Sequence, residues 1–129
     1  MRLVLSLRGY VEGEAEGELV VVNQRISFYG EVRDGKLVDG RSIVGKILVA
    51  LGTRGSTVAP YILYGLSKRG LAPRAIIVSS IEPMLVAGCV LSSIPLAGGL
   101  PPETIRQIHD GCQGKLIVKP PRAEAIIEC

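Results

Sequence analysis

The sequence predicts one α/β domain, residues 1–129, in which a mixed and partly closed β-sheet carries about three helices packed outside it. Three observations support this fold class. Segments with a period of two dominate the first part of the chain, and helix and strand signals alternate in the rest. The 129 residues are 47% hydrophobic, which is enough for one core. One Phe, four Tyr and no Trp make that core aliphatic.

Strands account for the first part of the chain. Leu3–Leu7 and Glu18–Val22 alternate or cluster β-forming residues, and Ile26–Tyr29 is strand-like. The dipeptide Asp34-Gly35 suits the positive φ angles of a tight turn, and a second turn is expected at Asp39-Gly40. The apolar run Ile43–Ala50 predicts a central strand.

The first well-marked helix is expected over Val58–Ser67. Pro60 is compatible only with the first turn of a helix, which puts the N-cap near Ser56 or Thr57. The helix should end near Lys68-Arg69-Gly70, where cations precede a glycine.

Strands and two further helices alternate after it. A helix should begin at Pro83 and run through Leu91, and a short one should begin at Pro101-Pro102-Glu103 and run toward His109. The segments expected to be extended are Ala75–Val78, Ile94–Leu96, Lys115–Lys119 and Ala123–Glu128.

Composition argues against several partners. The net charge of +3 comes from scattered residues, so no tail for polyanions is expected, and the few aromatic residues disfavour base stacking and hence nucleic-acid binding. Apolar stretches are interrupted well short of the ~20 residues that a spanning helix needs. Arg2 begins a strand rather than a signal peptide. We expect a cytoplasmic protein without membrane contact.

The three cysteines have no metal-site spacing, and the chain has one histidine. No metal site is therefore predicted. Cys89 lies in an apolar run and is expected to be a small buried residue. The state of Cys112 stays open, and Cys129 is expected to fray as a terminal residue.

Four glutamates, Glu12, Glu14, Glu16 and Glu18, occupy alternate positions. In an extended segment they share one side of the strand. A calcium site is one interpretation, but a solvated or charge-protected strand face is favoured.

The most informative segment is Leu51–Thr57, with the sequence LGTRGST, between a predicted strand and a predicted helix. A helix N-terminus offers backbone N–H groups and a partial positive charge. Arg54 adds a guanidinium, and Ser56 and Thr57 add hydroxyls. This combination predicts a site for an anionic small molecule.

Ser56 has several possible roles. It could simply cap the helix, or it could act as a nucleophile or base if its environment stabilises an alkoxide. A triad with His109 and Asp110 is formally possible, although no G-x-S-x-G segment is present.

Several segments, in this order, resemble the small subunit of aconitase X, which corresponds to the swivelling domain of aconitase encoded as a separate chain. The resemblance covers nearly the whole chain, and the R-G-S-T loop is its most specific part. The matching segments are Ile26–Gly30, Gly45–Val49, Gly52–Thr57, Ala75–Val78, Asp110-Gly111 and Lys115–Val118.

The resemblance implies a swivelling-domain fold and an archaeal hydro-lyase that dehydrates mevalonate 5-phosphate to trans-anhydromevalonate 5-phosphate in isoprenoid precursor synthesis. It places the proton-abstracting serine on Ser56, with Arg54, Gly55 and Thr57 as substrate contacts. It also implies a large subunit, forming a heterodimer, that holds an iron–sulfur cluster; none is expected on this chain. The cluster would act as a Lewis acid on the leaving hydroxyl.

The chain departs from the family in one segment. Where the family reads roughly F-W-G-G-V-D, this chain has Tyr29, Glu31 and Arg33. A different substrate, hydroxyproline, therefore stays open. Two other classes also stay open: a non-catalytic module for anion binding or assembly, and a phosphohistidine carrier that uses His109.

Overall fold

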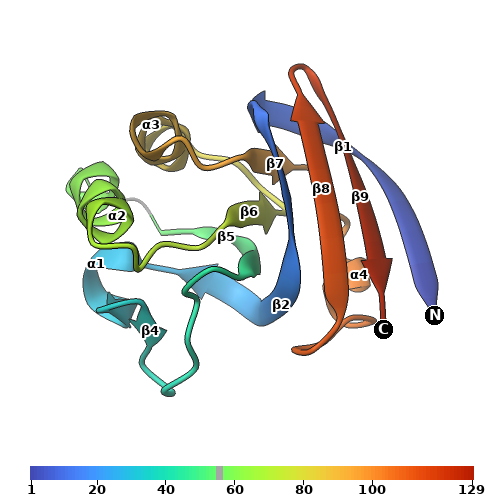
Figure 1. Cartoon of the computed structure of the whole chain (residues 1–129), viewed down its shortest axis with the longest axis horizontal. Helices are drawn as coiled ribbons and strands as arrows, with labels where there is room; N and C mark the ends of the chain where they lie inside the picture. Colours follow the sequence, from blue (N-terminus) through green and yellow to red (C-terminus); the bar gives the residue numbers. More distant parts are fainter. Residues whose placement is uncertain (55–56) are drawn as a thin grey trace.

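The computed structural model describes residues 1–54 and 57–129, and its sheet closes on itself (Figure 1). Closure is complete rather than partial, because β9 pairs with β1. The predicted fold class, a mixed sheet with helices outside it, is confirmed. The strands follow one another around the barrel as β1 (Arg2–Val11), β7 (Leu96–Gly98), β6 (Ala75–Val78), β5 (Ile47–Thr53), β2 (Gly13–Ile26), β8 (Gln113–Lys119) and β9 (Arg122–Glu128).

Four neighbouring strands, β2, β5, β6 and β7, run parallel, and the other neighbours run antiparallel. The first part of β2 pairs with β8 and its second part with β5, so this long strand joins the two halves of the sheet. Parallel strands end at the same edge of a sheet. The last residues of β2, β5 and β6 therefore meet on one side of the barrel.

Two helices, α2 (Ala59–Lys68) and α3 (Pro83–Ser92), lie side by side outside the parallel strands (Figure 1). They correspond closely to the first two predicted helices. The described residues also form two helices of one turn, α1 (Phe28–Glu31) and α4 (Pro102–Ile105). The third predicted helix, toward His109, is thus shorter than expected.

Two apolar clusters hold the fold together. One fills the barrel and the other lies between the sheet and helices α2 and α3. Strand β5 serves both, because Ile47 and Val49 point inward while Leu48 and Ala50 point toward the helices. A strand buried on both faces has a continuous apolar sequence rather than an alternating one, which is why this segment was recognisable.

The first two strands are longer than predicted. Strand β2 includes most of the acidic segment, and its carboxylates form ion pairs with neighbouring strand and loop residues: Glu16 with Lys115 at 3.4 Å and Glu18 with Lys46 at 3.6 Å. These contacts support the interpretation of a solvated strand face.

The turn predicted at Asp34-Gly35 is present, with φ angles of 52° and 77°. It joins two short strands, β3 (Val32–Arg33) and β4 (Lys36–Leu37), in a separate hairpin. The prediction that Ile26–Tyr29 is strand-like is wrong beyond its first residue. Strand β2 ends at Ile26, and α1 begins at Phe28. Phe28 enters the outer cluster as the chain turns, which overrides its preference for a strand.

Cys129 does not fray, in contrast to the prediction. Residues Gln113 and Glu128 are paired across β8 and β9, so Cys112 and Cys129, one position further out, face each other. Their Cα atoms are 4.4 Å apart and their sulfurs form a disulfide. The N–H of Cys129 also donates to the Met1 carbonyl at 3.0 Å.

Cys89 is buried in the outer cluster, as predicted. Burial raises the pKa of its thiol from 9.0 to about 12. The unfolded chain therefore loses this proton first, and the free energy of unfolding should fall as the pH rises from about 9 to about 12.

None of the described helices has the length and apolar character needed to cross a membrane.

A count of reactive thiols tests this arrangement. We expect no reaction of the folded protein with a thiol reagent at pH 8, one thiol after unfolding without reductant, and three after unfolding with reductant. The substitution Cys129→Ser should lower the free energy of unfolding by ~3 kcal/mol, because the disulfide closes a segment of 17 residues. Three reactive thiols without reductant would contradict the disulfide.

Candidate active site at the carboxyl edge of the parallel strands

The segment predicted to bind an anion lies where β5 leads into α2. Arg54 follows the last residue of β5, and Thr57 lies in the turn before α2, where it is exposed. The structure thus brings Arg54 and Thr57 to one edge of the sheet. Gly55 and Ser56 lie outside the described residues, so their roles stay predictions.

Helix α2 begins later than its predicted cap. Its N-cap is Val58, and within the described residues no side chain caps it. Pro60 lies in the first turn, as expected. The helix has 10 residues, and its N-terminus, which carries a partial positive charge, follows Arg54 along the chain.

Arg54 is fastened by its main chain and by its side chain. Its N–H donates to the carbonyl of Ile26 at 2.9 Å, which continues the pairing of β5 with β2. Its Nη2 atom forms an ion pair with Oε1 of Glu31. The Arg54 side chain is 59% exposed, whereas the Glu31 side chain is only 20% exposed.

The same Glu31 oxygen also caps α1. It accepts the N–H of Ser27 at 2.9 Å, while the Ser27 hydroxyl accepts the N–H of Gly30 at 3.3 Å. This reciprocal arrangement satisfies backbone donors at the start of the helix. Glu31 was not predicted from the sequence as a site residue. The spacing of Ser27 and Glu31, which indicates a helix cap, was the signal that could have drawn attention to it.

Two further contacts shape this edge. The hydroxyl of Thr53 donates to Oε1 of Glu82 at 2.8 Å, which ties the end of β5 to the N-cap residue of α3. At Gly52, a Cβ atom would lie 2.9 Å from Oγ of Ser80 and 3.0 Å from Nη1 of Arg25. Only glycine admits this close approach, which places a second guanidinium beside β5.

The space beneath Arg54 is filled. The cavity bounded by Phe28, Thr53, Ala59 and Leu63 has a volume of about 10 Å³, which leaves no room for a substrate. A larger groove of about 560 Å³ lies alongside, lined by the segment from Tyr29 to Val38 and including Glu31. A ligand of Arg54 must therefore bind on its outer, solvent-facing side.

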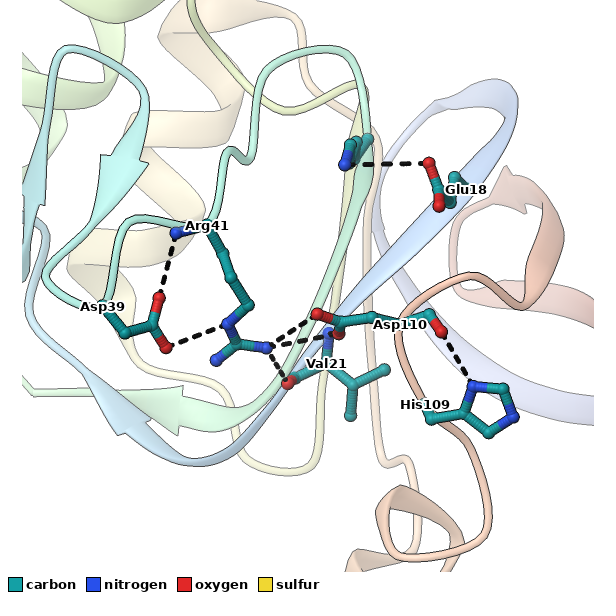
Figure 2. Close-up of polar contacts among 7 residues, drawn as sticks. Glu18, Val21, Asp39, Arg41, His109 and Asp110 are labelled. Carbon is teal, nitrogen blue, oxygen red and sulfur yellow. Dashed lines mark hydrogen bonds and ion pairs between the residues drawn. The ribbon is translucent and has the colours of Figure 1, made fainter.

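The triad hypothesis fails on the orientation of Asp110. Its carboxylate accepts the N–H of Val21 at 2.7 Å and pairs with Nη1 of Arg41 at 3.1 Å, as Figure 2 shows. Within the described residues, Nδ1 of His109 lies 2.7 Å from the main-chain oxygen of Asp110, not against its carboxylate. A triad needs the carboxylate itself on the imidazole.

The cysteines do not suit an iron–sulfur cluster. His109, Cys112 and Cys129 bring their donor atoms within 4.8 Å of one another, but the two sulfurs are joined in the disulfide. Cys89 is buried among apolar side chains. Cluster ligation needs several accessible thiolates. The three cysteines therefore do not form the set of free thiolates that such a cluster needs.

The aconitase X swivel domain model matches residues 4–127. The chain belongs to the aconitase X swivel domain family. It is 45% identical over 106 residues to the phosphomevalonate dehydratase small subunit of Aeropyrum pernix, with 81% of this chain and 80% of that one covered. The corresponding protein of Methanothrix thermoacetophila is 41% identical, with 89% and 87% covered.

A solved structure agrees with this assignment. The crystal structure of Thermococcus kodakaraensis aconitase X in its holo form is 34% identical and superposes with a TM-score of 0.86. The match covers 95% of this chain and 98% of that one. The predicted resemblance to aconitase X is thus confirmed over nearly the whole chain. This family match gives no support to the hypothesis of a phosphohistidine carrier that uses His109.

Arg41 links three parts of this swivel domain. Its Nη1 donates to the carbonyl of Val21 at 2.8 Å and contacts Asp110, and its Nε donates to Asp39 at 2.9 Å (Figure 2). Burial lowers the pKa of Arg41, but the contacts with Asp110 and Asp39 outweigh it and raise the pKa overall. A hydrogen bond from the Arg41 N–H lowers the pKa of Asp39.

We expect Arg41→Ala to lower the free energy of unfolding by about 1–2 kcal/mol, because three parts of the chain lose their shared donor while part of the pairing is screened by solvent. Chemical denaturation measures this value. Arg2→Ala is the matched control, since the Arg2 side chain forms an exposed ion pair with Glu128 at 3.6 Å. Equal losses in both variants would contradict the role of Arg41.

Proposed function

We propose that this chain is the small subunit of a phosphomevalonate dehydratase, a hydro-lyase that converts mevalonate 5-phosphate to trans-anhydromevalonate 5-phosphate. The observation that carries the proposal is the swivel family match over residues 4–127 together with the position of Arg54 at the carboxyl edge. Relatives with 41–48% identity carry this name.

Ser56 is the proposed base. In the proposed step, the deprotonated hydroxyl oxygen of Ser56 takes the proton α to the substrate carboxylate. The electron pair of the broken C–H bond forms the C=C bond, and the hydroxyl on the neighbouring carbon leaves as hydroxide. The proton taken by Ser56 and this hydroxide together make up the one water that the substrate loses. Arg54, the α2 N-terminus and nearby backbone N–H groups stabilise the charged oxygen that this role requires.

The substrate has two anionic groups, a carboxylate and a phosphate. The edge offers two guanidiniums. Arg25 lies on β2 opposite Gly52 of β5, and Arg54 follows the last residue of β5. We assign Arg54, with Gly55 and Thr57, to substrate binding. Arginine suits both groups because its donors match two oxygens at once.

A large subunit completes the site. The iron–sulfur cluster belongs to that subunit in this proposal, and when bound it supplies a Lewis acid for the leaving hydroxyl. Tyr29 on α1 and Tyr61 on α2 are each 71% exposed. Aromatic residues of this kind are enriched at the buried centres of interfaces. We propose that the large subunit covers them, and that the heterodimer is cytoplasmic.

Alternative functions lead to different results with the reconstituted complex. A hydroxyproline dehydratase would turn over hydroxyproline and not mevalonate 5-phosphate. Glu31 and Arg33, in the segment that departs from the family, are the observation that keeps this substrate open. A non-catalytic assembly module would bind the large subunit without affecting turnover.

Ser56→Ala tests the base. We expect kcat for mevalonate 5-phosphate to fall on the order of 10²–10⁴-fold in the anaerobically reconstituted complex, with unchanged subunit affinity. Exchange of the α-hydrogen of the substrate with D₂O should be lost as well. Ser67→Ala, near the other end of α2, is the matched control. Full turnover by the Ser56→Ala complex would show that the base is another group.

Tyr61→Asp tests the docking surface. A buried carboxylate without a partner is costly, so we expect the affinity for the large subunit to fall roughly tenfold or more. Calorimetry or gel filtration of mixed subunits measures this. Val4→Asp on β1 is the control, because Val4 is 60% exposed and β1 lies on the opposite side of the molecule from α2 (Figure 1). Equal losses in both variants would contradict this surface.

A further inference from the structure

We propose that Glu31 is a positioning residue for the substrate contact Arg54. It fixes the guanidinium of Arg54 so that the remaining donors face an anionic group of the substrate. This inference rests on the proposed function, because it assigns a role within the same site. The first observation is that one carboxylate oxygen accepts both the Ser27 N–H at 2.9 Å and Nη2 of Arg54.

The segment that carries Glu31 is rigidly held. Ile26 and Phe28, on either side of the α1 N-cap, are buried in the outer cluster with 2% exposure each. The reciprocal cap between Ser27 and Glu31 then sets where the carboxylate points. Glu31 is therefore fixed by the core and the helix start, independently of Arg54.

Packing constrains the side chain of Arg54 less than that of Glu31. The Arg54 side chain is 59% exposed, and the space beneath it is already filled by Phe28 and Leu63. A guanidinium has five N–H donors, and Glu31 engages Nη2. Within residues 1–54 and 57–129, the contact with Glu31 leaves the other donors free to face a ligand on the outer side. Holding an arginine in one conformation before binding removes part of the ordering cost of binding.

Glu31 also has an opposing effect, because its negative charge weakens the attraction of this edge for anions. Two variants separate the two effects. Glu31→Gln removes the charge but keeps an oxygen that can accept from Ser27 and Arg54. Glu31→Ala removes the charge and the acceptor together.

If positioning dominates, Glu31→Ala raises KM for mevalonate 5-phosphate about fivefold in the reconstituted complex, equivalent to about 1 kcal/mol for a partly exposed pair. Glu31→Gln should stay within about twofold of the unmodified complex, and kcat should change little in both. If both variants lower KM, the charge dominates, and the inference is wrong. Unchanged KM in both variants also overturns it.

A double-mutant cycle excludes a purely structural role. In an Arg54→Ala background, Glu31→Ala should cause no further rise of KM, because the residue that it positions is absent. Independent, additive effects would contradict the inference. Ser27→Ala is the control for the helix cap: it removes the acceptor for Gly30 and leaves the Arg54 contact in place, so it should lower the melting temperature without raising KM.

A second readout does not depend on activity. In NMR spectra of the full chain, the guanidinium protons of Arg54 should exchange with water more slowly than in Glu31→Ala. If the unmodified complex does not turn over mevalonate 5-phosphate, the proposed function fails, while this measurement still decides whether Glu31 holds Arg54. Equal exchange rates in the two proteins would overturn the positioning role by themselves.

Discussion

The parallel pairing of β2 with β5 is the constraint on which the rest of this structure depends. It places Ile26 beside Thr53, and the N–H of Arg54 extends the pairing by donating to the carbonyl of Ile26. The two segments that follow these strands therefore begin side by side. They are the capped turn of α1 and the loop that leads to α2. Because β5 is buried on both faces, this edge extends from a closely packed strand. The chemistry of the site follows from that placement.

Charged side chains of both signs lie at this edge. Glu31 forms an ion pair with Arg54, Glu82 accepts a hydrogen bond from Thr53, and the guanidinium of Arg25 lies beside Gly52. A chain with a net charge of only +3 can still offer an anion a localised site if the cations are oriented before the ligand arrives. The same edge is open to solvent and carries exposed tyrosines, which is consistent with a site that a second subunit closes.

Local chemistry explains which parts of the fold were predictable from sequence. The strand of Ile47–Thr53, the turn at Asp34-Gly35 and the helix containing Pro60 each carry their signal within a few residues. The disulfide was missed because it depends on the register of β8 and β9, which brings Cys112 opposite Cys129 across 17 positions. The contact of Glu31 with Arg54 spans 23 positions and depends on the closed sheet. The R-G-S-T loop could be recognised in the sequence as a family feature, whereas the contact of Glu31 with Arg54 could not.

The carboxyl edge of β2 and β5 is proposed as the place where substrate and partner meet. Hydrogen–deuterium exchange of this chain, alone and then with the large subunit and mevalonate 5-phosphate, tests this. We expect new protection in peptides covering residues 27–31 and 51–62, with little change in β1, β8 and β9. Protection confined to β1, β8 and β9, with the 51–62 peptides unchanged, would contradict it.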